Sequence, residues 1–290
     1  MFAITGITGK VGAAVARNLL AAGWPLRAVL RDRSKATSWS QLGCGTAVAD
    51  LLETEALTSA FEGTEGVFVL LPPIFDPAPG FSEAVGFIDS LRTALARTNP
   101  PKVVALSTIG ANAPQPNLLN VLGRMEEAFS SLTVPVTFLR AAWFMENAAW
   151  DIAAAKTGLI QSYLQPLDHP FPMVSTDDVG CLAAALLQER WTGKRTVELE
   201  GQRVSPIKLA AAFAKVLGHP VRAESVPRDR WESLFRAQGI KNPTPRMQML
   251  DGFNAGWIEF ADRGTHARKG SIGIDQAIAT LVQAEAARGA

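Results

Sequence analysis

The chain has few of the residues on which many common sites depend. Its 290 residues include two cysteines, Cys44 and Cys181, and three histidines far apart in the sequence. Two cysteines alone build neither a disulfide framework nor a zinc site, so we expect both to be small buried side chains in a reducing compartment. The chain also lacks a Gly-x-Ser-x-Gly elbow and a His-Glu-x-x-His pair, and we predict no metal site.

Charge and hydrophobicity exclude further classes. The formal net charge of +1 gives no basic excess that would favour nucleic acid or an anionic membrane as a direct partner. No apolar run reaches about 18 residues, so the sequence predicts no membrane span. The apolar residues 2–4 leave no room for the regions of a signal peptide, and we expect a cytoplasmic location. With 48% hydrophobic and 19% charged residues, a large folded core is expected.

The first twelve residues carry the most specific motif. An apolar run over residues 2–4 predicts a buried strand, glycines follow at positions 6, 9 and 12, and residues 13–22 form a helical stretch. In such a unit the first glycine permits a tight turn, the second lets the backbone approach a pyrophosphate, and the third lets helix and strand pack closely. The helix N-terminus also attracts an anion. We therefore predict a dinucleotide site formed by Gly6, Ile7, Thr8, Gly9, Lys10 and Val11.

Apolar runs and helical stretches alternate through the first half of the chain. Strands are expected at 26–30, 45–50, 66–71, 103–108 and 134–140, and helices at 53–61, 83–98 and 118–132. This alternation predicts an α/β fold, a doubly wound parallel-sheet Rossmann domain over residues 1–150.

Residues 151–290 are expected to form a smaller α+β substrate-covering region. A segment of about 170–200 within it should return to the Rossmann domain. Its helices are expected at 179–188, 206–217, 228–237, 244–255 and 274–288. Ser175 or Thr176 should cap the first of these helices and Ser205 the second, where Pro206 takes the first helical position.

Residues after two strands predict how the coenzyme is held. Arg31, Arg33 and Lys35 follow the strand at 26–30, and a guanidinium can bind a 2′-phosphate in a bidentate manner. We therefore expect NADP(H), with Arg31 and Lys35 among its contacts. NAD(H) is the alternative, because Asp32 could accept from a ribose hydroxyl. Leu71 and Pro72 end the strand at 66–71 and are candidate walls of the dinucleotide groove.

The glycine motif also supports a resemblance to a known family. Residues 5–12, Thr-Gly-Ile-Thr-Gly-Lys-Val-Gly, resemble the TGxTGxxG signature of extended and atypical short-chain dehydrogenases/reductases. The resemblance implies that Asp50 and Leu51 touch the adenine. Asp50 could instead cap the helix expected at 53–61.

The same family implies catalytic positions, only some of which are filled. A Ser or Thr at the end of the fifth strand assists catalysis there, and Ser107 and Thr108 are the candidates by position. Ordinary hydrogen bonding of hydroxyls at a strand end is the alternative. The family's Tyr-x-x-x-Lys pair is absent, because the helix at 118–132 contains no lysine and the single tyrosine, Tyr163, lies well beyond it.

A second stretch narrows the resemblance. The strand that ends in Leu139-Arg140 and the loop that ends in residues 144–147, Phe-Met-Glu-Asn, resemble the NmrA-like group of atypical short-chain reductases. The resemblance implies that this loop passes near the nicotinamide. Trp143 and Phe144, together with Phe75, are therefore candidates for the substrate pocket, although Trp143 and Phe144 could equally be core residues.

These features leave two functions open. The first is an NADPH-dependent oxidoreductase, similar to NADPH-dependent quinone oxidoreductases, that delivers hydride to a small hydrophobic electrophile such as a quinone. Without a Tyr/Lys pair, solvent or a bound water would supply the proton. The second is a non-catalytic NADP(H) sensor that binds a protein partner. The apolar candidate pocket favours the reductase, and the sensor is the alternative. The sequence leaves a homodimer or a protein partner open.

Overall fold

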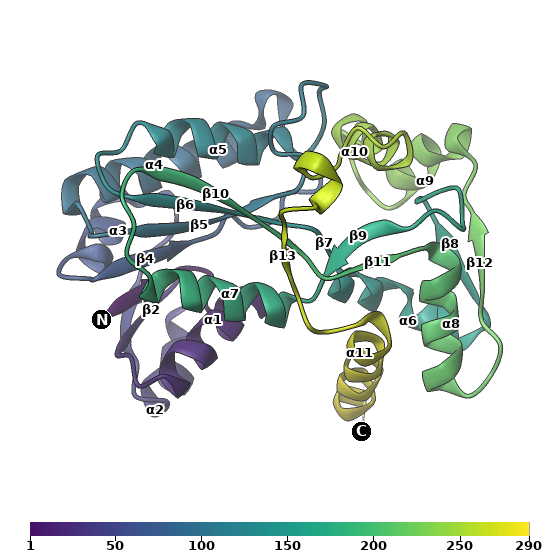
Figure 1. Cartoon of the computed structure of the whole chain (residues 1–290), viewed down its shortest axis with the longest axis horizontal. Helices are drawn as coiled ribbons and strands as arrows, with labels where there is room; N and C mark the ends of the chain where they lie inside the picture. The colour runs from purple at the N-terminus through teal and green to yellow at the C-terminus, as the bar shows by residue number, and fades with distance from the viewer. Residues whose placement is uncertain (290) are drawn as a thin grey trace.

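The computed structural model describes residues 1–289, and these are organised around an eight-stranded parallel sheet (Figure 1). In spatial order the strands are β13 (Arg268–Lys269), β10 (Lys194–Glu200), β6 (Val136–Ala141), β5 (Val103–Thr108), β4 (Gly66–Val69), β1 (Phe2–Ile4), β2 (Leu26–Leu30) and β3 (Gly45–Val48). Neighbouring strands pair in parallel, so their carboxyl ends meet at one edge. The order changes direction between β1 and β4, and dinucleotides bind at such a switch point. The expected doubly wound α/β fold is confirmed.

Helices cover both faces of this sheet. In Figure 1, α1 (Lys10–Ala21) and α7 (Thr176–Gln188) lie below it, and α4 (Ser82–Thr98) and α5 (Asn120–Ser130) lie above it. Helix α3 (Thr54–Phe61) packs beside α4, and the short α2 (Ala36–Gln41) follows β2. Side chains alternate along each strand, so Ile4 joins the core under α1 and α7 while Ala3 joins the core of α3, α4 and α5.

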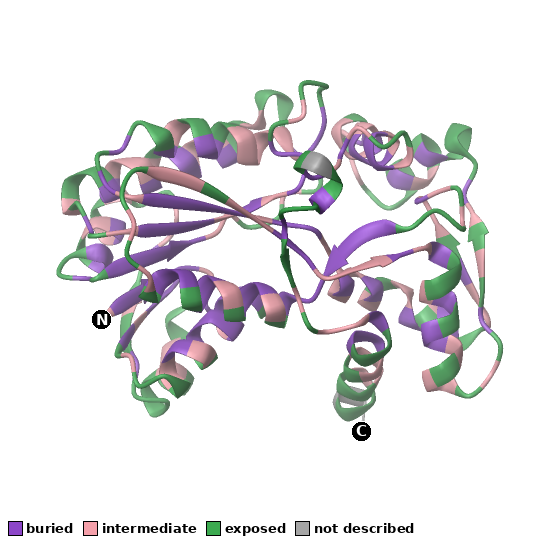
Figure 2. Cartoon of the chain, viewed as in Figure 1, coloured by how far each residue is buried: buried purple, intermediate pink, exposed green. Residues whose placement is uncertain are grey.

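The second half of the chain contributes to both parts of the molecule. Helix α7 packs on α1, and β10 pairs with β6, while two small sheets lie apart from the main one. These sheets contain β7 (Trp143–Phe144), β9 (Phe171–Val174) and β11 (Gln202–Val204), and β8 (Leu159–Ser162) with β12 (Arg222–Ser225). The accompanying helices are α6 (Ile152–Lys156), α8 (Pro206–Leu217), α9 (Trp231–Ala237), α10 (Thr244–Asn254) and α11 (Ile274–Gly289). Figure 2 shows that burial is concentrated in the main sheet and extends into β9 and the inner faces of α8 and α10.

Two of the helices begin at the caps that the sequence predicts. The Ser175 hydroxyl accepts from the Asp177 N–H at 3.2 Å, and the Ser205 hydroxyl accepts from the Lys208 N–H at 3.2 Å, so both expected caps are present. Helix α7 begins at residue 176 rather than 179, directly after its cap. Helix α1 begins at Lys10 rather than residue 13, since Gly9 is its N-cap and Gly12 lies inside it. Helix α5 is shorter than the expected 118–132.

Two further expectations can be judged here. Cys44 is buried as expected, but the expectation for Cys181 is wrong because its side chain is exposed on α7. Among the described residues, no helix combines the length and the apolar composition that a membrane crossing requires.

Candidate functional site

The three glycines of the turn between β1 and α1 have three different surroundings. Gly6 has a left-handed backbone with φ of +60°, and a Cβ there would lie 2.7 Å from the Leu70 side chain. A Cβ on Gly12 would lie 2.3 Å from the Gly6 carbonyl oxygen, so this glycine allows the helix to pack on the turn. Gly9 is exposed, and a Cβ there would meet only that carbonyl oxygen, at 3.3 Å. Of the three, Gly9 is the one with open space above the backbone.

Helix α1 presents its N-terminus beside Gly9. No side chain caps it and its first turn holds no acidic residue, so its first N–H groups face outward with the positive end of the helix dipole. Thr8, Gly9 and Lys10 are exposed, whereas the side chains of Ile7 and Val11 are buried, so these two would contact a ligand through their backbone alone. This arrangement fits the pyrophosphate of a dinucleotide.

The segment after β2 carries exposed cations. Arg31, Arg33 and Lys35 have no hydrogen-bond or ion-pair partner for their side chains among the described residues. Asp32, between them, accepts from the Ser34 N–H at 2.9 Å and from the Ser34 hydroxyl at 2.7 Å, and these bonds hold the pKa of its carboxyl below the usual range. The carboxylate therefore closes its own turn, and the charge around it is positive. We refer to residues 6–12 with these three cations as the coenzyme edge.

The adenine and groove candidates lie after β3 and β4. One carboxylate oxygen of Asp50 accepts from the Leu52 N–H at 2.9 Å, while Glu53 is the N-cap of α3. The alternative that Asp50 caps this helix is therefore wrong, since the side chain closes the preceding turn. Leu51 and Leu71 are half-buried and Pro72 is exposed. Because β4 ends at residue 69, Leu71 and Pro72 lie in the loop that follows it.

Of the two hydroxyl candidates on β5, Ser107 belongs to a buried network. Its hydroxyl donates to the Glu126 carboxylate at 2.5 Å, and Arg140 binds the same carboxylate through two bonds of 2.9 and 2.6 Å. The hydrogen bonds that Arg140 donates to the Glu126 carboxylate raise the pKa of Arg140. Thr108, next along the strand, faces the other side of the sheet, is half-buried, and has no side-chain partner among the described residues. Thr108 is thus the candidate with a hydroxyl left to bind a ligand.

Four aromatic side chains lie in the loop after β4 and in the segment that follows β6. Phe75, in the loop after β4, contacts Trp150 edge-on at 5.6 Å between ring centroids, and Trp143 contacts Phe253 of α10 in the same way at 5.3 Å. Phe75 and Trp150 are 36% and 60% exposed, and Trp143 and Phe144 are half-buried. We call Phe75, Trp143, Phe144 and Trp150 the aromatic wall.

Hydrogen bonds on two sides hold the segments of the aromatic wall in place. The Lys10 ammonium donates to the Glu146 carbonyl at 3.3 Å, which joins the glycine turn directly to the 3₁₀ segment η3 (Met145–Asp151). The Glu146 carboxylate in turn accepts from the Ser175 hydroxyl at 2.8 Å and from the Thr176 N–H at 2.9 Å. On the other side, the Asp76 carboxylate accepts from the Asn242 N–H at 2.7 Å, so the Phe75 loop is held against the C-terminal half.

Tyr163 follows β8 and lies in an aromatic cluster of that half. Its ring stacks on Phe235 at 5.0 Å and meets Trp231 edge-on at 5.7 Å. Burial raises the pKa of Tyr163, against smaller opposite effects of the Arg246 charge and a hydrogen bond with Gln238. Although no lysine lies one turn away in the sequence, the fold thus brings a cation close to this tyrosine.

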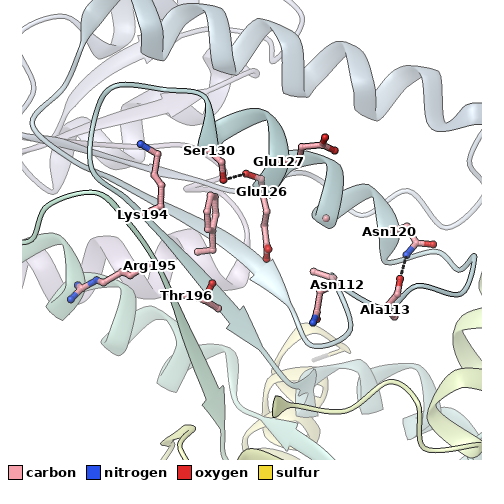
Figure 3. Close-up of a pocket in the computed structure, with 12 residues that line it drawn as sticks. Asn112, Ala113, Asn120, Glu126, Glu127, Ser130, Lys194, Arg195 and Thr196 are labelled. Carbon is pink, nitrogen blue, oxygen red and sulfur yellow. Dashed lines mark hydrogen bonds between the residues drawn. The ribbon is translucent and has the colours of Figure 1, made fainter. Parts of the chain in front are cut away.

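A cavity of about 580 Å³ lies away from the glycine turn, between α5, the loop after β5, and strands β6 and β10 (Figure 3). Its cations are occupied, because Lys194 donates to the carbonyls of Leu132 and Val134, and Arg195 donates to Thr137 and Glu189. None of residues 6–12 lines this cavity, and its lining is more polar than apolar. No group of potential metal ligands occurs in the part of the chain that the structure describes.

The chain belongs to the NAD(P)H-binding family, whose sequence profile matches residues 6–190. This span starts at the first glycine of the turn and includes α7. A NAD(P)H azoreductase of Xenophilus azovorans is 26% identical over 247 residues, which are 83% of this chain and 82% of the relative. A (4-alkanoyl-5-oxo-2,5-dihydrofuran-3-yl)methyl phosphate reductase of Streptomyces griseus is 28% identical over 251 residues, 84% and 83% of the two chains.

Solved structures show the same fold. The triphenylmethane reductase of Citrobacter sp. complexed with NADP(H) has a TM-score of 0.81 at 20% identity, covering 97% of this chain and 99% of that one. An NADPH-dependent quinone oxidoreductase of Escherichia coli complexed with NADPH has a TM-score of 0.80 at 21% identity, covering 97% and 100%. A mutant NmrA gives 0.74 at 19% identity, covering 100% and 97%. The NmrA-like resemblance is confirmed at the level of the fold.

Three residues at or near the site were not assigned a role from the sequence. Glu126 engages Ser107, Glu146 positions the aromatic wall, and Arg246 lies beside Tyr163. Their partners are distant in the sequence, so no spacing signals them. Asp32 and Asp50 do have a local signal, because each accepts from the N–H two positions on, as in an Asx turn.

Proposed function

We propose that the protein is an NADPH-dependent reductase that delivers hydride to a small conjugated acceptor, such as a quinone or an azo compound. The observation that carries the proposal is the contact between Lys10 and the Glu146 carbonyl, because it sets the aromatic wall against the phosphate-binding turn. A coenzyme whose pyrophosphate lies on α1 would extend along the carboxyl ends of the strands towards that wall.

The coenzyme edge suits NADPH better than NADH. The uncapped N-terminus of α1 and the open space above Gly9 would receive the pyrophosphate. Arg31, Arg33 and Lys35 are free to bind a 2′-phosphate, and the carboxylate that could have favoured a ribose hydroxyl is held by Ser34. Asp50, Leu51, Leu71 and Pro72 are the proposed contacts with the adenine side and the groove.

The residues proposed to contact the acceptor, on what we call the acceptor side, would hold it in position and would not act as acids or bases. When bound, NADPH supplies a hydride, and a quinone that takes up this hydride and one proton from water becomes a hydroquinone. The aromatic wall would hold a flat acceptor by stacking, and the Thr108 hydroxyl is the proposed hydrogen-bond donor to it. Ser107 is engaged with Glu126, and Tyr163 has a raised pKa, so neither fits a proton donor at neutral pH.

The relatives support this choice. Two curated relatives are named as reductases, one of azo compounds and one of a phosphate ester, and two structural neighbours are named as reductases of dyes and of quinones. The named acceptors are conjugated, and three of the four names include a nicotinamide coenzyme. Conjugated acceptors present flat apolar faces, which match the aromatic wall.

The test is oxidation of NADPH in the presence of naphthoquinones, enones and azo dyes. We expect turnover with at least one conjugated acceptor and loss of that turnover in Gly9→Asp, whose coenzyme site is blocked. The opposite outcome is that NADPH binds tightly and no acceptor is reduced, but bound NADPH changes the affinity of the protein for a partner protein. In that case the protein is a sensor and the proposal is wrong.

A further inference from the structure

Arg246 on α10 differs from the other arginines that lie over aromatic rings. Its guanidinium is 5.5 Å from the centre of the Phe75 ring and 4.7 Å from that of Phe235, and the side chain is half-buried. Among the described residues it has no hydrogen-bond acceptor and no carboxylate partner. The cation therefore lies over two aromatic rings, and its N–H groups have no acceptor among the described residues.

Other arginines of the chain also lie over aromatic rings, but their hydrogen bonds differ from those of Arg246. Arg228, over the Trp231 ring at 4.7 Å, binds the Asp251 carboxylate through bonds of 2.6 and 2.7 Å. Arg195, over Trp191, binds Glu189, and Arg124, over Phe81, donates to the Gly80 carbonyl. Each of these cations has an acceptor.

The acids on the elements around Arg246 are engaged elsewhere. Asp76, next to Phe75, accepts from the backbone N–H groups of Lys241 and Asn242, and Asp251 is held by Arg228. Burial lowers the pKa of Arg246, although a guanidinium stays protonated in a protein. A half-buried cation without a counterion costs stability, which is expected when the missing partner is a ligand.

The position of Arg246 ties it to the acceptor side of the site. Arg246, Leu250 and Phe253 share one face of α10, and Phe253 contacts Trp143 of the aromatic wall. The ring of Phe75, another member of the wall, lies over the guanidinium itself. The neighbouring Pro245 carbonyl accepts from the Leu118 N–H at 2.9 Å, which joins the start of α10 to the loop after β5.

We propose that Arg246 binds an anionic group, a carboxylate, sulfonate or phosphate, carried by the conjugated acceptor. The inference rests on the proposed function and adds the charge of its substrate. A guanidinium presents a planar set of N–H donors that matches the oxygens of such groups in a bidentate manner. Since Arg246 lies over Phe75 and Phe235 and its N–H groups have no acceptor among the described residues, those groups remain for the anion, and the acceptor's rings would lie along the aromatic wall.

The experiment compares three azo dyes that differ in one substituent. The neutral dye is 4-(dimethylamino)azobenzene, and the other two carry a carboxylate or a sulfonate at the far para position. For each dye, kcat/KM is measured with saturating NADPH for the parent protein and for Arg246→Met, which keeps the apolar stem between the rings. Because each dye is compared with itself, differences in intrinsic reactivity cancel.

We expect Arg246→Met to lower kcat/KM by about ten-fold or more for the anionic dyes and by less than about two-fold for the neutral dye. A loss with one of the two anionic dyes alone identifies the anion that is read. Arg228→Met is the matched control, since it removes a ring-stacked arginine of the same half that already has a carboxylate, and it should leave the preference unchanged. An equal loss for all three dyes, or a preference that survives in Arg246→Met, overturns the inference while the reductase function stands.

A binding measurement separates the two proposals. Titration of each dye into the protein saturated with NADP⁺, followed by calorimetry, reports dye affinity without turnover. Weaker binding of an anionic dye to Arg246→Met than to the parent supports the inference even if no dye is reduced, in which case only the reductase proposal fails. Binding of the anionic dyes that is unaffected by the substitution, or no binding of them to the parent, overturns the inference.

Discussion

The coenzyme edge and the acceptor side of this site are built by different means. The coenzyme edge consists of backbone N–H groups, one open glycine and three exposed cations, all within the first 35 residues. The proposed acceptor side is assembled from the loop after β4, the segment 143–151 and helices α9 and α10. It holds two half-buried charged groups, Arg246 and Asp151, that have no hydrogen-bond partner among the described residues. Charges of this kind lower stability, so they indicate where a ligand is expected to bind.

The difference also explains why one side tolerates more change than the other. A phosphate site made of backbone depends on the path of the chain, and few substitutions other than at its glycines can alter it. A site made of side chains from distant segments can change its substrate through single substitutions. Relatives that share the fold and the coenzyme can therefore differ in acceptor, as the names of the azo, dye and quinone reductases indicate.

The largest effect is expected at Gly9. Its φ of −92° is open to any residue, and a Cβ would meet only the Gly6 carbonyl oxygen, at 3.3 Å, so Gly9→Asp should fold. Its carboxylate would face the pyrophosphate and lower NADPH affinity by about 100-fold or more, as measured by calorimetry. Gly9→Asn, of equal size and no charge, should lose much less affinity. Unchanged affinity in folded Gly9→Asp would remove the phosphate site from this turn.

The second prediction concerns the choice between coenzymes. Arg31→Ala should weaken NADPH far more than NADH, because NADPH alone carries the 2′-phosphate. The loss of a charge-assisted hydrogen bond costs about 1.5–3 kcal/mol, or roughly ten-fold and more in the dissociation constant. Calorimetric titration of both coenzymes into parent and variant checks it. If the two affinities fall equally, Arg31 acts through general charge and does not read the phosphate.

The third prediction tests whether a buried charge on the acceptor side lowers the free energy of unfolding. Asp151 is the last residue of η3, next to Trp150 of the aromatic wall. Burial raises the pKa of its carboxyl to about 6, and the carboxylate has no hydrogen-bond donor among the described residues. A carboxyl whose pKa is raised on folding binds more protons in the folded state, so this residue lowers stability as pH rises from about 4 to 6.

Asp151→Asn should therefore increase the free energy of unfolding by about 1–3 kcal/mol at pH 7 and leave it nearly unchanged below pH 4. Urea titrations at several pH values measure the gap, which should open between pH 4 and 6 and then stay constant. A gap that is independent of pH would show that the carboxylate is not penalised by its surroundings.

The smallest effect is expected for Tyr163→Phe. This change keeps the ring that stacks on Phe235 and removes a hydroxyl whose pKa is raised. A general acid contributes ~10²–10⁴ to turnover, whereas we expect a change below about ten-fold in kcat with saturating NADPH. A drop of about 100-fold, with coenzyme affinity intact, would mean that Tyr163 transfers the proton and that Arg246 acts as its neighbouring cation.

The sequence predicts the coenzyme edge better than it predicts the acceptor side. The glycine turn, the strand alternation and the caps at Ser175 and Ser205 could be predicted because each depends on residues close together in the chain. The start of α1 was placed too late, since an uncapped helix gives no side-chain signal at its N-terminus. The contacts of Arg246 with the rings of Phe75 and Phe235, and of Glu146 with Ser175, depend on tertiary packing, which no spacing reveals.

The central claim is direct hydride delivery from NADPH to a conjugated acceptor held by the aromatic wall. The most direct measurement is a single turnover of the protein saturated with NADPH that carries deuterium at one or the other face of its nicotinamide C4, mixed anaerobically with the best acceptor of the panel. The account predicts one NADPH oxidised per acceptor reduced and a rate constant that deuterium lowers at one face only. Tight NADPH binding without any oxidation, or a rate insensitive to deuterium at both faces when chemistry is limiting, would contradict it.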